Sequence, residues 1–244
     1  MRMLIGVGVG PGDPELVTGR AVRVLTEADR VMAPSTAADA VGRAESIVRQ
    51  ACPSVAVERL VFEMAPGSAE RSAALDAAAE RVAECLDAGE QVAFVTLGDP
   101  NIYSTFSSLA DCVQRRRPGA PVETVPGIMA FQELAARSGT GLLRGTERLS
   151  LVTALDGADV LDEVLGDPEQ AVVVYKGGRH LPAVAKRLAD AGRLDDAVAG
   201  ELLGLPGERI AAASDMAEGP ATYLMTVIVP PRARAGGDGG GGSG

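Results

Sequence analysis

LIGVGVGPGDPEL, residues 4–16, joins a short apolar run to a cluster of glycines and then breaks at Pro11. This pattern is typical of a first β-strand followed by a turn that cradles the phosphates of a nucleotide. The dinucleotide fingerprint GxGxxG needs its third glycine five positions after the first. That position is not glycine in any of the three possible registers, where it holds Pro11, Asp13 or Glu15. A P-loop is excluded too, because no Gly-Lys-Ser or Gly-Lys-Thr follows.

The charges in this loop also argue against phosphate, since the carboxylates of Asp13 and Glu15 would repel it. The glycines therefore indicate a backbone that approaches some other ligand closely. Asp13, Pro14 and Glu15 form a favourable N-cap, N1 and N2 series for a helix. Asp13 thus has two possible roles, one in starting a helix and one in binding a ligand.

The bulk composition limits the possible classes of protein. The chain has 244 residues, enough for one large domain or two domains of about 120 residues each. Hydrophobic residues make up 46%, which provides for a substantial core. The net charge of -10 argues against nucleic acid as a partner, because binding phosphates needs clustered Lys and Arg.

The cysteines, the single histidine and the lengths of the apolar runs limit the possible classes of protein further. The three cysteines, Cys52, Cys85 and Cys112, are widely spaced and form no CxxC pair, so we expect neither disulfides nor a zinc site. His180 is the only histidine, which excludes a metal site built from several histidines. No secretory signal and no apolar run near 18 residues is visible, so we expect a cytoplasmic protein that does not span a membrane.

Short apolar runs alternate with helical patterns along the chain, which predicts an α/β fold. Several runs are continuous in Val, Ile and Leu, as in strands buried on both faces of a parallel sheet. The strands are expected at residues 3–9, 30–33, 91–97, 122–125, 149–154, 171–175 and 223–229. The helices are expected at residues 14–28, 70–88 and 181–191, the second with a core-facing stripe at helical spacing.

The stretch RRRPGAP, residues 115–121, combines charge, proline and glycine near the middle of the chain and predicts a domain junction. We therefore expect an N-terminal α/β domain over residues 1–118 and a C-terminal α/β domain over residues 119–232. Residues 233–244 are rich in glycine and carry no core-forming side chain, so a disordered tail is expected there.

The opening design recurs twice in the first half of the chain. Gly98-Asp99-Pro100 directly follows one expected strand, and Pro126-Gly127 directly follows another. In open α/β sheets, ligands collect at the carboxyl ends of the strands. Three such corners predict a pocket lined by backbone groups, which would suit a ligand with an adenine, a ribose and an amino-acid end.

Together these corners resemble the signatures of the tetrapyrrole methylase family, a class of S-adenosylmethionine-dependent methyltransferases that modify corrin precursors. The resemblance runs from about residue 3 to residue 230 and is carried by a combination of motifs. They are VGVGPGDPELVTGRAVRVLTEADRV at 7–31, FVTLGDPNIYSTF at 94–106, VETVPGIMAFQELAARSG at 122–139, VVVYKGGRHLPAV at 172–184 and GPATYLMTVIVP at 219–230.

This resemblance implies two α/β domains with a cleft between them, in which S-adenosylmethionine binds and S-adenosylhomocysteine is left as product. It implies a fold other than the Rossmann-type methyltransferases, in agreement with the failed fingerprint. Carried over by position, the implied cofactor-binding residues are Pro11, Leu97, Gly98, Asp99, Ile102, Met129, Ala130, Lys176, Ala221 and Thr222.

Three features resemble the branch of the family that methylates precorrin-2 at carbon 20, giving precorrin-3A in cobalamin biosynthesis. They are Tyr-Ser-Thr-Phe at 103–106, Lys-Gly-Gly-Arg-His at 176–180 and an insertion at 33–50. The family also implies a homodimer. Methylation of cobalt-precorrin-2 or of another ring position stays open, and a nucleotide-binding module without catalysis is the alternative from another class.

The substrate implied by the resemblance is a polycarboxylate, so an acidic protein needs a local basic patch to bind it. Arginine is well suited because its guanidinium forks onto carboxylates. The candidate substrate-binding residues are Gly10, Asp13, Lys176 and Arg179, together with His180 and the weaker candidates Arg20 and Arg144. Lys176 stands where much of the family has methionine. A lysine head group beside a sulfonium is unfavourable, so Lys176 is expected to contact the cofactor only through its backbone.

Methyl transfer to a macrocycle carbon that is already nucleophilic is governed mainly by positioning. The sequence does not identify the base that removes the proton lost from the substrate. Asp99, Tyr103 and His180 are weak candidates. Asp99 could instead cap a helix beginning at Pro100, Tyr103 could pack, and His180 could pack or cap.

Overall fold

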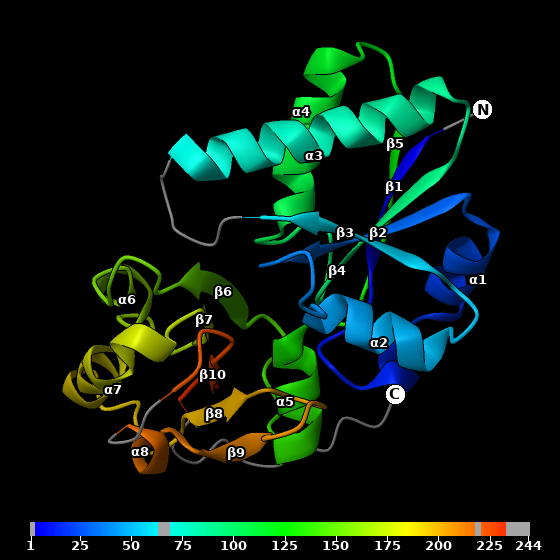
Figure 1. Cartoon of the computed structure of the whole chain (residues 1–244). Helices are drawn as coiled ribbons and strands as arrows, with labels where there is room; N and C mark the ends of the chain where they lie inside the picture. Colours follow the sequence, from blue (N-terminus) through cyan, green and yellow to red (C-terminus); the bar gives the residue numbers. More distant parts are fainter. Residues whose placement is uncertain (1–2, 63–68, 218–220, 233–244) are drawn as a thin grey trace, which may run out of the picture. The chain divides into compact units, whose positions relative to one another are not determined.

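The computed structural model describes residues 3–62, 69–217 and 221–232 (Figure 1). It confirms an α/β protein with two compact units. The chain passes from the first unit to the second after Glu133, and the short segment Leu203–Pro206 groups with the first unit. The expected tail, residues 233–244, lies outside the described residues. No helix in the described ranges is long and apolar enough to cross a membrane.

The first unit is built on a five-stranded sheet in the order β3-β2-β4-β1-β5, with every neighbouring pair parallel. Its strands are β1 (Leu4–Gly8), β2 (Arg30–Ser35), β3 (Val57–Val61), β4 (Val92–Thr96) and β5 (Val122–Val125). Val7 of β1 is opposite both Val95 of β4 and Val125 of β5. The carboxyl ends of these three strands therefore lie side by side, and all three expected corners begin there.

Helices cover both faces of this sheet, α3 and α4 on one face and α1 and α2 on the other (Figure 1). Alternate residues of β1 point to opposite faces: Leu4 packs with α3 and α4, and Ile5 with α1 and α2. The helices are α1 (Gly19–Glu27), α2 (Arg43–Ala51), α3 (Ala69–Asp87), α4 (Thr105–Arg116) and α5 (Ala130–Ser138), which continues into the second unit.

The helix expected over residues 14–28 is wrong in its extent, because two shorter elements share this stretch. A 3-10 turn, η1 (Pro14–Leu16), comes first, and α1 begins only at Gly19. Val17 is extended between them, and the Thr18 hydroxyl caps α1 by accepting from the Ala21 N–H at 3.1 Å. The N-cap signal at Asp13 therefore starts a single turn, and a second cap starts the helix.

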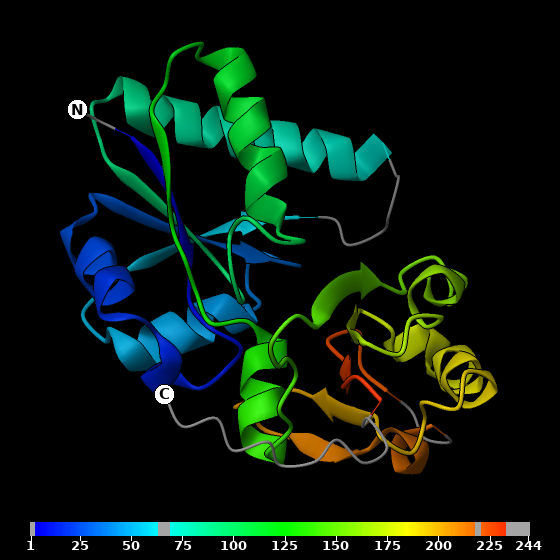
Figure 2. The ribbon, with the colours of Figure 1, turned by 180° about the vertical axis from the view of Figure 1, so that it is seen from behind.

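The second unit holds a mixed five-stranded sheet in the order β6-β7-β10-β8-β9. Only β6 and β7 are parallel, so the parallel pairing that the continuous apolar runs indicate holds throughout the first sheet and for one pair of strands here. Short helices cover one face of this sheet, with α7 prominent among them (Figure 2). The elements are β6 (Arg148–Thr153), α6 (Leu161–Val164), β7 (Gln170–Tyr175), η2 (Gly178–His180), α7 (Leu181–Asp190), β8 (Val198–Glu201), β9 (Arg209–Ala212), α8 (Ala213–Met216) and β10 (Thr226–Val229).

All seven expected strands are present in the structure. The strand expected from Tyr223 begins only at Thr226, and β3, β8 and β9 are additional. The predicted junction at 115–121 precedes β5, which pairs with β1 and so belongs to the sheet of the first unit. The compact first unit accordingly extends past this junction to Glu133. Cys52, Cys85 and Cys112 are buried free thiols.

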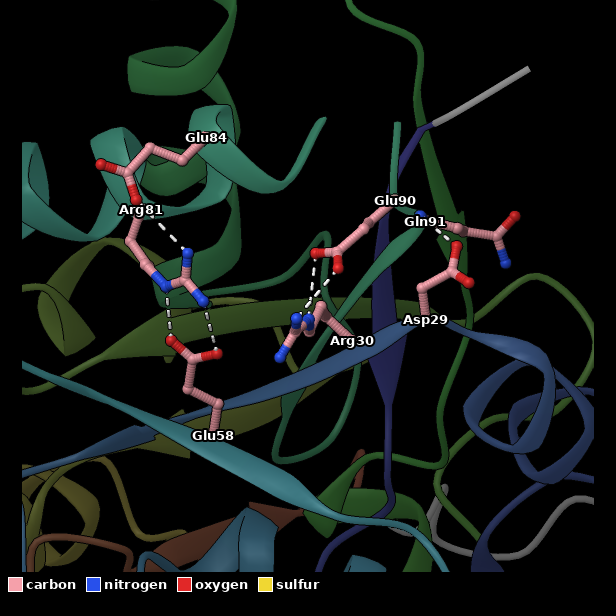
Figure 3. A network of polar contacts seen from close by, with 7 residues as sticks. All are labelled: Asp29, Arg30, Glu58, Arg81, Glu84, Glu90 and Gln91. Carbon is pink, nitrogen blue, oxygen red and sulfur yellow. Dashed lines mark hydrogen bonds and ion pairs between the residues drawn. The ribbon is translucent and has the colours of Figure 1, made fainter. Parts of the chain in front are cut away.

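Ion pairs join α3 to β3 and the loop before β4 to β2 of the first sheet (Figure 3). Arg81 of α3 makes two hydrogen bonds to Glu58 of β3, at 2.7 and 3.2 Å. Arg30 of β2 makes two to Glu90, both at 2.9 Å, and holds the pKa of that carboxyl below its usual range. Burial raises the pKa of the nearby Cys85 thiol to about 11. The same network includes Asp29, Glu84 and Gln91.

A buried carboxylate holds the insertion at 33–50 against the sheet. Glu45 of α2 is fully buried and accepts two hydrogen bonds from Arg59 of β3, at 2.7 and 3.0 Å, and one from Arg49 at 2.9 Å. Arg59 also donates to the Ala38 carbonyl at 2.9 Å. The hydrogen bonds from Arg59 lower the pKa of Glu45 despite its burial. The insertion is thus anchored by one ion cluster.

Candidate functional site

The first corner, residues 9–13, extends the pairing of β1 and β4 beyond the strands themselves. The Val9 N–H donates to the Thr96 carbonyl at 3.0 Å, and the Gly98 N–H donates to the Gly10 carbonyl at 2.9 Å. Gly10 has a left-handed φ of 78°, which glycine adopts without strain. Asp13 Oδ1 accepts from the Glu15 N–H at 2.8 Å, which confirms the capping role of Asp13.

Three glycines allow the three corners to meet backbone to backbone. A Cβ on Gly8 would lie 2.4 Å from the Gly98 carbonyl oxygen, and a Cβ on Gly127 would lie 2.1 Å from the same atom. Backbone atoms at such a junction cannot move aside as a flexible side chain can. Glycine is therefore required at positions 8 and 127 by close approach.

Asp99 ties the second corner to the third. Its Oδ1 accepts from the Asn101 N–H at 2.9 Å, and its Oδ2 accepts from the Gly127 N–H at 3.1 Å. The Asn101 side chain also donates to Asp99, at 3.2 Å, and to Thr124 of β5, at 3.3 Å. Both oxygens of the Asp99 carboxylate are thus engaged in holding the corners together.

The helix expected to begin at Pro100 begins later, so the expected capping role of Asp99 is wrong. The structure has turns at residues 100–103, and α4 starts at Thr105 with Ser104 as its N-cap. The Ser104 hydroxyl accepts from the Phe106 N–H at 3.0 Å. Tyr103 precedes this helix and has a left-handed φ of 49°. That conformation is costly for a residue with a Cβ, by about 1–2 kcal/mol.

The remaining cofactor-binding candidates of the first unit lie in or next to the three corners. Pro11 is buried, Leu97 is half-buried, and Met129 is 9% exposed. Ala130 begins α5, and Ile102 is exposed. A Cβ built on Gly98 would find Met129 Cα at 3.9 Å and nothing closer, so the second corner has open space on that side.

The second-unit candidates also come together, because β7 and β10 are paired. Lys176 follows β7 with a left-handed φ of 59°, and its N–H donates to the Met225 carbonyl at 3.1 Å. Its Nζ lies 5.7 Å from the centroid of the Tyr223 ring, within the range of a cation–π contact. A Cβ on Gly178 would lie 1.9 Å from the Thr222 carbonyl oxygen, so the turn after β7 rests directly on the segment before β10.

A buried carboxylate that the sequence analysis missed supports this segment. Glu201, at the end of β8, is 3% exposed. Its Oε2 accepts from the Thr222 N–H at 2.7 Å, and its Oε1 accepts from Arg209 at 3.0 Å. Thr222 Oγ1 is buried and has no hydrogen-bond partner in the part of the chain that the structure describes. No motif marks Glu201 in the sequence, because its partners lie in other strands and loops.

The candidate cations are distributed over both units. Arg179 is exposed and His180 half-buried in the η2 turn, directly after the Gly178 contact with Thr222. Arg144 is exposed in the loop before β6. Arg20 of α1 lies 4.0 Å from Glu123 of β5 and lines a hollow of about 700 Å³ between β5 and α4. Of these, Arg179 and His180 are next to the cluster formed by Lys176 and Thr222.

The chain matches a known protein family over most of its length. Residues 3–216 match the family model described as Tetrapyrrole (Corrin/Porphyrin) Methylases. The chain belongs to the tetrapyrrole methylase family.

Individual tetrapyrrole methylases resemble the chain over nearly its whole length. The Precorrin-2 C(20)-methyltransferase of Sinorhizobium sp is 34% identical over 236 residues, covering 93% of this chain and 94% of that protein. The Cobalt-precorrin-2 C(20)-methyltransferase of Salmonella typhimurium is 30% identical over 233 residues, covering 93% and 95%. The crystal structure of the methyltransferase CobJ shares the fold, with a TM-score of 0.69, 20% identity and coverage of 97% and 98%.

Proposed function

We propose that this chain is an S-adenosylmethionine-dependent methyltransferase that methylates precorrin-2 at carbon 20, giving precorrin-3A in cobalamin biosynthesis. The observation that carries the proposal is its similarity, end to end, to two proteins named for methylation at that carbon. Cobalt-precorrin-2 is the second candidate substrate, because one of these two relatives is named for it. Methylation of another ring position is the less favoured alternative.

The chain's own residues fit the cofactor in both units. In the first unit, the open side of Gly98 leaves room for a ligand against the backbone of the second corner. In the second unit, the unpartnered Thr222 hydroxyl is a buried polar atom that a ligand with hydrogen-bonding groups would satisfy. We therefore assign cofactor contacts to Pro11, Leu97, Gly98, Asp99, Ile102, Met129 and Ala130, and to Lys176, Ala221 and Thr222.

When bound, the cofactor supplies an electrophilic methyl group for an in-line displacement, and the chain's residues contribute mainly positioning. Asp99 contributes through its backbone, because its carboxylate already holds Asn101 and Gly127. The Nζ of Lys176 lies over the Tyr223 ring, so we assign its ammonium group no role at the sulfonium of the cofactor. Tyr103 and His180 remain the candidates for accepting the proton lost from carbon 20.

Substrate carboxylates need cations, and Arg179 is the strongest candidate. It is exposed beside the Lys176 turn, and no ion pair joins it to another residue that the structure describes. The guanidinium is therefore available for a bidentate contact with a carboxylate. Gly10 and Asp13 are assigned to the same substrate through the first corner, with Arg20 and Arg144 as weaker candidates.

The decisive experiment is incubation under anaerobic conditions with precorrin-2 and methyl-labelled cofactor, followed by carbon NMR of the product. A labelled methyl group on carbon 20 supports the proposal, and a label on another carbon refutes the assigned position. A parallel reaction with cobalt-precorrin-2 decides between the metal-free and the cobalt-loaded substrate.

A nucleotide-binding module without catalysis is the alternative from another class, and the failed phosphate fingerprint disfavours it. Calorimetry with S-adenosylhomocysteine and with ATP separates the two. Binding of ATP without binding of S-adenosylhomocysteine would refute the methyltransferase proposal. We also propose a homodimer, to be tested by light scattering, and a cytoplasmic location, to be tested by cell fractionation.

A further inference from the structure

The Glu201 side chain occupies the point where the β8–β10 ladder ends. The last paired residues are Gly200 of β8 and Thr226 of β10. Beyond them the chain turns, with the Met225 N–H donating to the Thr222 carbonyl at 3.1 Å. The Thr222 N–H therefore has no strand partner at this point, and the Glu201 carboxylate accepts it at 2.7 Å.

Placing a carboxylate here is costly unless both of its oxygens are well paired. Arg209 provides the second partner, since it lies directly opposite Glu201 in the β8–β9 register and donates at 3.0 Å. A neutral, apolar side chain at position 201 would avoid the cost of burying a charge but would leave the Thr222 N–H without a partner. The ion pair thus serves to hold one backbone group in one place.

Two contacts fix the backbone of Thr222, but its hydroxyl makes no hydrogen bond to the residues that the structure describes. Glu201 holds the N–H, and Gly178 lies so close to the Thr222 carbonyl that no Cβ fits between them. The Thr222 Oγ1, in contrast, is buried without a hydrogen-bond partner among the described residues. A residue whose backbone is fixed and whose hydroxyl is unsatisfied is preorganised to bind a polar ligand.

We infer that Glu201 is a positioning residue for the cofactor, acting through Thr222. Glu201 is buried, and its two oxygens accept from Thr222 and Arg209, so its role is to hold Thr222. It sets the position and direction of the Thr222 hydroxyl and neighbouring backbone. This inference rests on the proposed function, in which the segment 221–222 contacts S-adenosylmethionine.

The test compares Glu201→Ala and Glu201→Gln with a matched control, Glu208→Gln. The control makes the same chemical change near β9, where Glu208 accepts from Arg137 at 2.6 Å, whereas the Thr222 N–H donates to Glu201. Calorimetry gives the dissociation constant for S-adenosylhomocysteine, and thermal unfolding gives the stability of each variant. Steady-state kinetics give separate KM values for cofactor and tetrapyrrole.

We expect Glu201→Ala to raise the dissociation constant about tenfold or more, because a hydrogen bond to a charged group is lost. Glu201→Gln keeps an acceptor for the Thr222 N–H and should weaken binding less. In both variants the KM for the cofactor should rise, while the KM for the tetrapyrrole stays unchanged. Glu208→Gln should bind as the unaltered chain does.

The outcomes separate this inference from the proposed function. An unaltered chain that binds no S-adenosylhomocysteine refutes the proposed function, and the inference with it. An unaltered chain that binds, together with Glu201 variants of equal affinity, overturns the inference alone, even if the variants unfold at lower temperature. If Glu201→Ala does not fold, Glu201→Gln and Arg209→Met give the same comparison.

Discussion

A single methyl group added at Gly98 should weaken cofactor binding about tenfold or more, at a small cost in the stability of the fold. Gly98 has a left-handed φ of 63°, which costs a residue with a Cβ about 1–2 kcal/mol. Alanine also restricts the unfolded chain, which offsets roughly 0.4–1 kcal/mol of that cost. The new Cβ would meet no atom closer than Met129 Cα at 3.9 Å, so no steric clash is added. The expected net loss of stability is about 1 kcal/mol, or a fall of about 2–4 °C in Tm.

The matched control is Gly119→Ala, in the loop between α4 and β5 of the same unit. Gly119 has a left-handed φ of 87°, and a Cβ there would meet nothing within 4 Å. The backbone penalty is therefore similar, and the fall in Tm should be similar too. Position 119 has no assigned contact with the cofactor, whereas at position 98 the methyl group takes up the space proposed for it.

Calorimetry with S-adenosylhomocysteine and thermal unfolding of both variants provide the assay. We expect Gly98→Ala to raise the dissociation constant about tenfold or more, the effect of a misplaced methyl group in a tight contact. Gly119→Ala should bind as the unaltered chain does. Equal affinity in the two variants would show that the open side of the second corner does not face the cofactor.

Three further results are expected. Gly127→Ala places a Cβ 2.1 Å from the Gly98 carbonyl, so it should cost about 3 kcal/mol or more in urea unfolding, and a loss under about 1 kcal/mol would contradict the close junction. Arg59→Met leaves the buried Glu45 carboxylate with Arg49 as its remaining partner and should cost about 1.5–3 kcal/mol at pH 7. Arg59 lowers the pKa of Glu45, so its stabilisation is present above the ordinary carboxyl pKa and lost as pH falls through the lowered one. The deficit of Arg59→Met in urea titrations should therefore shrink on acidification, and a deficit independent of pH would argue against this ion pair. Arg179→Ala should raise the KM for the tetrapyrrole more than that for the cofactor, and equal effects in steady-state kinetics would remove Arg179 from the substrate site.

Local patterns in the sequence predicted much of the secondary structure. Continuous apolar runs between turn residues marked seven strands, since a buried strand needs apolar side chains on both faces. Asp13 before Pro14 marked a helical start, because a cap requires only its own neighbours. The same reasoning failed at Pro100, where the Asp99 carboxylate binds a distant loop as well as its own turn.

The strands that were missed have weak local signals. VERLV, VAGE and RIAA at β3, β8 and β9 are four or five residues long and contain charges or small residues. They form strands because neighbouring strands accept their backbone hydrogen bonds, which propensity alone does not reveal. The antiparallel pairs of the second sheet were not predicted, for the same reason.

The sequence by itself determined the three glycine corners, the apolar strands before them and the family to which those motifs point. The order β4-β1-β5, which sets the corners side by side, was decided only by the tertiary structure. The tertiary structure also decided two hydrogen bonds between distant residues. The Gly127 N–H donates to Asp99, 28 positions away in the sequence, and the Thr222 N–H donates to Glu201, 21 positions away. The physical reason is that turns and caps depend on adjacent residues, whereas buried polar groups find partners only when distant segments pack together.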